Sequence, residues 1–312
     1  MTESESLPFV FGGIEPPLSD FSSASVLVWP VPFEKTVSYG KGTSGGPAAI
    51  IDASRNMELY DEELDAETVS IGIHTLPPVE TSYEPGQMMR VLEQTAADLL
   101  QTGKFLCMLG GEHSISAPVV RASQRAFPQL SVLQIDAHAD LRDRYDGTEF
   151  SHASTMRRVL ETCPAVQVGI RSLSIEEARV IPELPTRIFF AKDICGRTGW
   201  IEKVVESLSQ DVYLTIDIDG LDPSLVPSTG TPEPGGLMWY ELLSLLRAVA
   251  QARRIVGMDL VELAPSPMSP APCFLAAKLV YKVLGFVFKD RLSTRTSRDG
   301  DRPHLSGLPP RE

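Results

Sequence analysis

Short apolar runs recur along the chain, and most of them are followed by a segment in which apolar residues have helical spacing. The runs cover residues 26–31, 68–73, 105–109, 131–135, 165–170, 187–191, 211–217 and 254–260. Their apolar content is nearly continuous rather than alternating, which is typical of strands buried on both faces. The pattern predicts eight strands in a mainly parallel sheet.

Helical patterns fill the segments between these runs. Residues 85–100 carry Met88, Leu92 and Leu99 at helical spacing, and Pro47 suits the first turn of a helix. The predicted helices cover residues 47–60, 85–100, 114–126, 201–208, 239–250 and 270–288. Because strands that alternate with helices form βαβ units, the chain is predicted to be an α/β protein.

The two ends of the chain differ in composition from its centre. Residues 1–24 are rich in Ser and Pro, and residues 290–312 combine charged residues with Ser, Pro and Gly. A tail with so few apolar side chains buries too little surface to offset the entropy lost on ordering. We therefore expect an N-terminal extension over residues 1–24, one domain over residues 25–289 and a disordered tail over residues 290–312.

The charge of the chain narrows the classes of partner. Its 312 residues include 28 Lys+Arg and 41 Asp+Glu, which gives a formal net charge of −13. Nucleic acids and anionic membranes attract clustered positive charge, so we expect neither as a partner. An acidic protein suits a small cationic ligand, although many cytosolic proteins are acidic.

The cysteines and the N-terminus favour a cytoplasmic location. Four widely spaced cysteines form no Cys-x-x-Cys pair: Cys107, Cys163, Cys195 and Cys273. Reduced thiols are therefore expected rather than disulfides or a zinc site. The N-terminus lacks the basic and apolar regions of a signal peptide, and there is no run of about 18 apolar residues that could span a membrane.

Histidines and acids gather directly after the predicted strands. His113 follows the third predicted strand, and Asp136, His138 and Asp140 follow the fourth. Ligands bind at the carboxyl ends of parallel strands, so these side chains are predicted to share one edge of the sheet. In an extended segment, the spacing of two residues would place the two acids and His138 on one side.

A further strand adds two more acids, Asp217 and Asp219, where its apolar run ends. Four carboxylates and two imidazoles at one edge would repel one another unless cations neutralise them. Carboxylates with imidazole suit Mn²⁺ better than structural Zn²⁺, and shared carboxylates can bridge two ions. A single Asp after a strand is usually a cap or turn residue, and a single loop His is usually a surface residue. The combination instead predicts a binuclear metal site.

Two other patterns indicate different chemistry only weakly. Residues 40–45 match the Gly-x-Gly-x-x-Gly of dinucleotide-binding loops, but no strand directly precedes them, so a substrate-rim or packing loop is favoured. Metallophosphoesterases also combine Asp-x-His with a Gly-rich His segment. In those enzymes the Gly-rich segment follows the Asp-x-His pair, whereas here it comes first, which argues against that class.

Three motifs resemble those of the ureohydrolase family, which includes arginase, agmatinase, guanidinobutyrase and formiminoglutamase. They are Gly-Gly-Glu-His-Ser at residues 110–114, Asp-Ala-His-Ala-Asp at 136–140 and Asp-Ile-Asp-Gly-Leu-Asp-Pro at 217–223. The resemblance implies a three-layer α/β/α, arginase-like fold with a central eight-stranded, mainly parallel sheet. Residues 25–289 would then form the ureohydrolase catalytic domain.

The resemblance also implies roles for individual residues. Two Mn²⁺ per subunit would share a water whose pKa they lower. One ion would be bound by His113, Asp136, Asp140 and Asp217, and the other by Asp136, His138, Asp217 and Asp219. Asp140 would also pass a proton to the leaving amine. His152 is implied as a proton shuttle at the site entrance and Glu262 as the ligand of the guanidinium, so both would be catalytic and substrate-binding residues. A surface histidine and a structural ion pair are the respective alternatives.

The segment after Asp140 bears on the substrate. Arginases carry an Asn there that helps to bind the α-amino and carboxylate groups of arginine, and this chain lacks it. The Glu-Phe-x-His ending at residues 149–152 resembles agmatinases, which implies hydrolysis of agmatine to putrescine and urea in polyamine biosynthesis. Three loop acids are compatible with a cationic substrate, or are solvated surface acids: Asp143, Asp146 and Glu149.

Departures from the family pattern leave the substrate tail open. Ser228 and Ala153 replace common glycines, and residues 266–268 lack a common Asp. Relatives with a similar Met-Arg-Arg segment, here residues 156–158, are thought to prefer N1-aminopropylagmatine, so that compound, guanidinobutyrate and other guanidino compounds are alternatives. A non-catalytic homologue that binds a guanidino or polyamine ligand and a metal-dependent deacylase are alternatives of other classes. The family is commonly trimeric or hexameric, so we expect a homo-oligomer.

Overall fold

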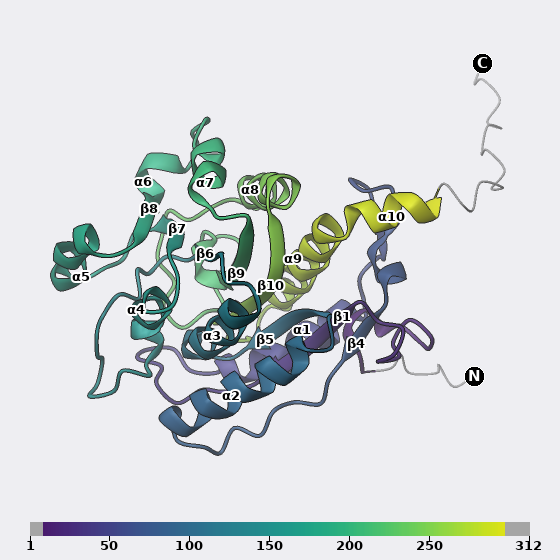
Figure 1. Ribbon diagram of the computed structural model, residues 1–312, viewed down its shortest axis with the longest axis horizontal. Helices are drawn as coiled ribbons and strands as arrows, with labels where there is room; N and C mark the ends of the chain where they lie inside the picture. The colour runs from purple at the N-terminus through teal and green to yellow at the C-terminus, as the bar shows by residue number, and fades with distance from the viewer. Residues whose placement is uncertain (1–8, 297–312) are drawn as a thin grey trace.

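The central sheet of the protein contains eight parallel strands. The computed structural model describes residues 9–296, and the strand order is β4-β1-β5-β10-β9-β6-β7-β8 (Figure 1). Every neighbouring pair is parallel. The strands are β1 Val26–Val31, β4 Ile73–Thr75, β5 Phe105–Gly110, β6 Leu130–Ile135, β7 Ala165–Ile170, β8 Thr186–Phe190, β9 Asp211–Asp217 and β10 Arg254–Val261. The predicted eight-stranded parallel sheet is confirmed.

Helices cover both faces of this sheet and complete three layers (Figure 1). The α-helices are α1 Gly46–Ser54, α2 Pro85–Leu100, α3 Ser116–Ala126, α4 Thr155–Leu160, α5 Ile175–Val180, α6 Ala191–Ile194, α7 Ile201–Ser207, α8 Trp239–Ala252, α9 Ala271–Val287 and α10 Lys289–Thr296. Side chains of α1, α7, α8 and α9 share one buried cluster with the sheet, and those of α2, α3 and α4 share a second. The predicted α/β/α architecture is therefore confirmed.

Short 3-10 helices lie mainly in the connections. They are η1 Phe11–Gly13, η2 Thr43–Gly45, η3 Thr68–Ile71, η4 His113–Ile115, η5 His152–Ser154, η6 Ile181–Glu183 and η7 Ile218–Gly220. Three of them, η4, η5 and η7, begin at or directly after predicted site residues. Most predicted site residues therefore lie in turns beyond the strands, whereas Asp217 is the last residue of β9.

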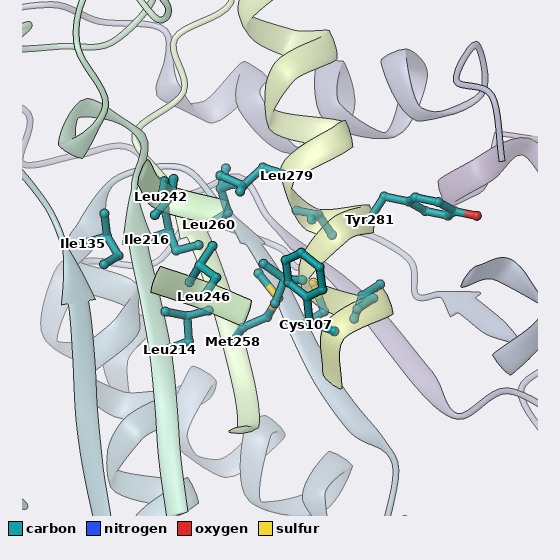
Figure 2. Close-up of a cluster of buried hydrophobic side chains, with 14 of the residues drawn as sticks. Cys107, Ile135, Leu214, Ile216, Leu242, Leu246, Met258, Leu260, Leu279 and Tyr281 are labelled. Carbon is teal, nitrogen blue, oxygen red and sulfur yellow. The ribbon is translucent and has the colours of Figure 1, made fainter. Parts of the chain in front are cut away.

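The layer between the sheet and helices α8 and α9 shows how the central strands are fixed. Figure 2 shows Leu214 of β9 and Met258 of β10 beside Leu246 of α8. All three side chains are fully buried. Burying one such side chain contributes about 1.5–3 kcal/mol relative to leaving it exposed, so this layer holds in place the strands whose carboxyl ends carry the predicted site.

One predicted strand is displaced. The sequence predicts a strand over residues 68–73, but Thr68–Ile71 form η3 and β4 begins at Ile73. Gly72 lies between them with a φ of 78°, a left-handed conformation that ends the regular backbone. Val69 is buried, so the apolar character of this run reflects the packing of a 3-10 turn against the core.

Several shorter elements were not predicted. The helix expected over residues 47–60 ends at Ser54, and β2 (Tyr60–Asp61) pairs with β3 (Ala66–Glu67) in an antiparallel hairpin. Lys282 of α9 fixes this hairpin, because its Nζ lies 3.0 Å from Asp61 Oδ1. Helices α4, α5 and α6 have at most six residues, too few to show a clear helical period.

Both ends of the chain bear on the predicted domain boundaries. Phe11 and Ile14, inside the expected N-terminal extension, are buried in the first core cluster. Helix α10 occupies the beginning of the expected tail, and residues 1–8 and 297–312 lie outside the described residues. The boundaries stay a prediction. Between residues 9 and 296, no helix combines the length and the apolar character needed to cross a membrane.

Candidate metal centre

The carboxyl ends of four adjacent strands carry the predicted site residues. His113 lies in η4 after β5, Asp136 follows β6, Asp217 ends β9 and Glu262 follows β10. Parallel strands present their carboxyl ends at the same edge of a sheet, so the four segments converge. They surround a cavity of about 150 Å³, whose lining includes His113, His138, Asp140, His152, Asp217, Asp219 and Glu262. Asp136 is fully buried beside them.

One cluster of ligand atoms centres on His113. Its Nδ1 lies 3.1 Å from Asp136 Oδ2, 3.1 Å from Asp140 Oδ2 and 3.4 Å from Asp217 Oδ2. All four side chains are buried. Despite these distances, Nδ1 has no hydrogen-bond partner among residues 9–296. The geometry therefore does not match an N–H donating to a carboxylate.

A second cluster centres on His138. Its Nδ1 lies 2.9 Å from Asp219 Oδ2 and 3.6 Å from Asp136 Oδ1. Asp136 thus reaches both clusters with different oxygens. Two groups of three residues each bring one ligand atom per residue to within 4.8 Å of the others. The first group is His113, Asp136 and Asp140, and the second is Asp136, His138 and Asp219. Asp217 lies beside the first group, and its predicted contact with the second ion stays a prediction.

A buried hydrogen-bond relay orients His113. Thr215 donates to Asp259 Oδ1 at 2.6 Å, and its other candidate acceptor, Ser116 Oγ, is 3.4 Å away. Tyr213 donates to the second oxygen of Asp259 at 2.8 Å. His113 Nε2 lies 2.9 Å from Thr215 Oγ1. Because the single hydroxyl proton of Thr215 goes to the carboxylate, Nε2–H donates to Thr215 and Nδ1 carries a lone pair. A lone pair facing carboxylates needs a cation between them, so the donor set fits a metal ion.

Burial makes this concentration of negative charge unfavourable. Burial raises the pKa of Asp217 well above its usual value, and repulsion from Asp219 and Asp136 adds to the rise. Burial and the charge of Asp136 raise the pKa of Asp140 to about 7. Burial opposes charge on His138, but hydrogen bonds to Asp136 and Asp219 raise its pKa to about 12. The cluster thus attracts positive charge strongly, as a cation site must.

The Asp-Ala-His-Ala-Asp segment is extended only in part: His138 forms a parallel bridge with Ser172, but the backbone bends at Ala137 and leaves the extended region at Asp140. Asp140 has a φ of 53°, in the left-handed region. Two hydrogen bonds to ligand carboxylates hold the segment in this shape. His138 N donates to Asp136 Oδ1 at 2.6 Å, and Ala137 N donates to Asp219 Oδ1 at 3.0 Å. The ligands therefore orient the backbone of their own loop.

Arg171 fixes the loop that carries Asp219. Its guanidinium donates, at 2.7–3.4 Å, to the main-chain oxygens of Gly169, Asp219, Gly220, Leu221, Glu233 and Pro234. The planar group offers five N–H donors in a fixed arrangement, which suits several carbonyls at once. Arg171 thereby connects the metal-facing turn to the segment around residue 233.

Glu262 lies in the cavity wall on a strained backbone. Its φ of 65° is uncommon for a residue with a side chain and costs about 1–3 kcal/mol. Its Oε1 accepts a hydrogen bond from His113 N at 2.7 Å. Burial raises the pKa of Glu262 well above its usual value. A cation in the cavity would favour the charged carboxylate, which suits the predicted contact with a guanidinium.

His152 lies at the cavity wall in η5, where the Ser151 hydroxyl caps the turn. Its ring packs edge-on against Tyr145, with centroids 5.8 Å apart. Burial, followed by repulsion from His113 and His138, lowers the pKa of His152 to about 4. The ring is therefore neutral near pH 7. The structure thus brings every predicted site residue to one cavity or its immediate edge, while their individual roles stay predictions.

The model of the Arginase family matches residues 24–285. The chain belongs to the arginase family. An N(1)-aminopropylagmatine ureohydrolase of Synechocystis is 41% identical over 278 residues, which cover 86% of this chain and 91% of the relative. An agmatinase of Bacillus anthracis is 35% identical over 78% of this chain and 85% of its own. The crystal structure of agmatine ureohydrolase of Thermoplasma volcanium has a TM-score of 0.80 at 30% identity and covers 87% of this chain and 92% of its own.

Arginase-family enzymes hydrolyse small guanidino compounds at a binuclear metal centre. In this arginase-family chain, the two groups of residues that share Asp136 bring together the ligands for such a centre. The predicted resemblance to ureohydrolases is therefore confirmed, and so is the arginase-like fold. The structural relatives include enzymes with different substrates, so the fold leaves the substrate to the residues of the cavity.

The glycine-rich loop at residues 40–45 belongs to the cavity wall of this arginase-family site. Its backbone donates to the carboxylate of Glu34, from Gly42 N at 3.0 Å and from Ser44 N at 2.8 Å. These are the donors that would bind a phosphate in a dinucleotide-binding loop. Tyr39 and Gly40 line the cavity. The preference for a rim loop over a dinucleotide site is consistent with this arrangement.

Arg158 forms ion pairs with two of the three loop acids that the sequence analysis considered as substrate contacts. It lies 2.6 Å from Asp143 Oδ1 and 3.1 Å from Glu149 Oε2. Its side chain is 11% exposed, so these pairs are shielded on the arginine side. Arg142, which carries positive charge, lines the cavity and lies over the ring of Tyr145. These observations favour a structural role for Asp143 and Glu149 in this arginase-family chain.

Several supporting residues of the site, Arg171 among them, were not singled out from the sequence. Asp259 and Thr215 are polar residues inside apolar strands, and that contrast is a signal that could have found them. Glu112 lies inside a recognised motif but was given no role. Thr36 lies in a polar loop segment without any such signal, far from the motifs that it contacts.

Proposed function

We propose that the chain is a ureohydrolase that uses two Mn²⁺ to hydrolyse the guanidino group of a cationic polyamine precursor. The observation that carries the proposal is the lone pair of His113 Nδ1, which faces three buried carboxylates. The proposed ligands are His113, Asp136, Asp140 and Asp217 for one ion, and Asp136, His138, Asp217 and Asp219 for the other. Carboxylate and imidazole ligands of this kind suit Mn²⁺.

The proposed reaction adds water to the guanidinium carbon. When bound, two divalent ions supply Lewis acidity and lower the pKa of a water toward neutrality. The bond from that carbon to the substituted nitrogen breaks, and both protons of the water are transferred to that nitrogen. The products are urea and an alkylammonium ion, so charge and atoms balance.

Three side chains would position the substrate and move its protons. Glu262 would bind the guanidinium through the oxygen that His113 N does not occupy, since Oε1 already accepts that hydrogen bond. Asp140 would pass a proton toward the leaving nitrogen. His152, neutral because burial holds its pKa at about 4, would accept a proton at the cavity wall and transfer it onward.

The substrate that the comparisons favour is N1-aminopropylagmatine, with agmatine as the second candidate. Two curated relatives with the first activity are 41% and 39% identical to this chain, whereas an agmatinase is 35% identical. The cavity wall offers Tyr39, whose side chain is 82% exposed. We propose that its ring contacts the second ammonium group of the longer substrate, a cation–π interaction worth about 0.5–1 kcal/mol at an exposed site.

A panel of guanidino compounds tests the activity and the substrate together. Mn²⁺-loaded protein is incubated with N1-aminopropylagmatine, agmatine, guanidinobutyrate and arginine, and urea is assayed. We expect the highest kcat/KM with N1-aminopropylagmatine and no urea after EDTA treatment. Tyr39→Ala should reduce the preference over agmatine about two- to fivefold, which corresponds to that cation–π energy. A higher kcat/KM with agmatine would make agmatine the preferred substrate. Absence of urea with all four compounds would support a non-catalytic guanidino-binding protein.

Assembly and location complete the proposal. We propose a homo-oligomer, trimeric or hexameric as is common in ureohydrolases, which light scattering of the purified protein would measure. We also propose a cytoplasmic location, supported by four cysteines that are all free thiols. Fractionation of cells that express the full chain tests this second point.

A further inference from the structure

A buried carboxylate, Glu112, lies behind the cavity wall that contains His152. It is fully buried and accepts four hydrogen bonds. Its Oε2 accepts from Lys35 N and from Thr36 N, each at 2.6 Å. Its Oε1 accepts from Thr36 Oγ1 at 2.7 Å and from Ser114 Oγ at 2.6 Å. Four donors match the acceptor capacity of an ionised carboxylate.

Thr36 links this carboxylate to the histidine. Its hydroxyl has one proton, and that proton goes to Glu112. The Thr36 oxygen can therefore only accept from His152, which approaches it twice. The backbone N of His152 lies 3.1 Å from Thr36 Oγ1, and the ring Nδ1 lies 3.3 Å from the same atom. The two lone pairs of the hydroxyl match these two donors when Nδ1 carries the ring proton.

The remaining neighbours of the ring agree with that tautomer. Ser151 Oγ lies 3.3 Å from Nδ1 and can either donate or accept. Ser38 Oγ lies 3.5 Å from Nε2, where it can donate to a lone pair. Ser38 lines the same cavity as His152. The arrangement repeats that of His113, whose Nε2 is joined through Thr215 to the buried Asp259.

We propose that Glu112 and Thr36 are positioning residues that hold His152 with its proton on Nδ1 and a lone pair on Nε2. The Nε2 lone pair can then accept an N–H of the substrate or a proton that leaves the attacking water. This consequence for turnover rests on the proposed function, whereas the tautomer itself does not. A histidine with the opposite tautomer would present a donor and could not accept a proton there.

Nitrogen NMR of the histidine ring tests the tautomer directly. Protein with ¹⁵N-labelled histidine is loaded with diamagnetic Mg²⁺, and the His152 signals are identified by their loss in His152→Asn. At pH 7 we expect a protonated Nδ1 and an unprotonated Nε2 in the wild type. Thr36→Val removes the acceptor and should shift the population toward Nε2–H, since Ser151 can then donate to Nδ1. Thr36→Ser keeps the hydroxyl and should restore the wild-type signals.

Glu112→Gln should reverse the direction of the hydrogen bonds that join residue 112, Thr36 and His152, rather than remove them. With its carbonyl oxygen toward the backbone donors, the Gln amide would donate to Thr36, whose proton would then turn toward His152 Nδ1. We expect the Nε2–H tautomer in this variant. Ser114→Ala is the matched control, because it removes a 2.6 Å hydrogen bond to Glu112 without touching Thr36. Its histidine signals should remain as in the wild type.

Kinetics separate the inference from the proposed function. Thr36→Val should lower kcat about tenfold or more at unchanged metal content, since general acid–base catalysis contributes about 10²–10⁴-fold, and Thr36→Ser should recover most of it. A protonated Nε2 in the wild type, or wild-type signals in Thr36→Val, overturns the relay. The expected signals with no urea from any guanidino compound support the relay and overturn the proposed function.

Discussion

Two histidines of the site are connected in the same way but in different surroundings. His113 reaches the buried Asp259 through Thr215, and His152 reaches the buried Glu112 through Thr36. We call the first arrangement the floor relay and the second the rim relay. In the floor relay, Thr215 and Asp259 lie on the adjacent strands β9 and β10 at matching positions of the sheet. In the rim relay, Thr36 lies in a loop and His152, 116 positions away in the chain, lies in η5.

The difference between the relays indicates a division of labour. The floor relay turns the lone pair of His113 toward three carboxylates, so it serves the binding of metal ions. The rim relay would leave the lone pair of His152 on Nε2, beside Ser38 in the cavity wall, so it would serve the transfer of protons. Changes to the floor should therefore alter metal content, and changes to the rim should alter turnover at constant metal content.

Removing a metal-facing carboxylate should have the largest effect. Asp219→Ala deletes the oxygen beside His138 Nδ1, and Asp219→Asn deletes its charge but keeps an acceptor for Ala137 N. We expect both variants to lose the second ion and nearly all turnover, as measured by metal analysis and urea release. Only the Ala variant should also lose stability, by about 1–3 kcal/mol, because it leaves a buried N–H without a partner.

An exposed loop carboxylate outside both relays provides the control for this experiment. Asp143→Asn changes an exposed acid that pairs with Arg158, and an exposed ion pair contributes only about 0–1 kcal/mol. Its metal content and turnover should match those of the wild type. Two full equivalents of metal in Asp219→Ala would contradict the assignment of the second site.

Replacing the rim histidine should have the second largest effect. His152→Asn removes the ring but leaves the backbone N–H that donates to Thr36. We expect kcat to fall about 100-fold, within the contribution of general acid–base catalysis, while metal content stays at the wild-type level. Steady-state kinetics with metal analysis of the same samples measure both quantities. A variant that loses metal, or that retains full kcat, would remove the distinction between rim and floor.

Breaking the floor relay should cost less than deleting a ligand. Thr215→Val removes the hydroxyl between His113 and Asp259, so the lone pair of Nδ1 is no longer fixed toward the carboxylates. Such outer partners of metal ligands contribute about 10–100-fold to metal affinity. We expect a loss of this size in calorimetric titration with Mn²⁺, and recovery in Thr215→Ser. The comparison with Thr36→Val is decisive, because that variant should bind Mn²⁺ normally.

The two relays also show what sequence analysis could reach. The metal ligands lie at short spacings after apolar strands, so the order of strands in a parallel sheet brings them together. His113, Asp217 and Glu262 were therefore predictable at the same edge. The convergence of Asp136 and His138 was predicted from their spacing in an extended segment. The segment is extended only in part, and hydrogen bonds to Asp136 and Asp219 also hold its shape.

The rim could not be predicted in the same way. Thr36 is a common residue in a polar loop, and its contact with residue 152 depends on how two long connections pack over the edge of the sheet. Arg171 is similarly hidden, because its main-chain acceptors carry no side-chain signature. The displaced strand at residues 68–73 has the same origin: an apolar run reports burial, and burial alone does not distinguish a 3-10 turn from a strand.

A further expected effect concerns the pH dependence of stability and again distinguishes rim from floor. Burial lowers the pKa of His152 from 6.5 to about 4 in the folded protein. Between these values the unfolded chain binds a proton that the folded chain does not, so stability falls as pH decreases from 6.5 toward 4. Above pH 6.5 the ring is neutral in both states, so it contributes no dependence of stability on pH.

His152→Asn lacks this group, so the free energy of unfolding of the wild type should decrease relative to the variant as pH falls from 6.5 toward 4. Urea denaturation of both proteins in EDTA, at several pH values, measures the difference without a contribution from metal binding. A difference that is constant from pH 7 to pH 4 would show that His152 is as solvated as it is in the unfolded chain, and the buried rim relay would then have no basis.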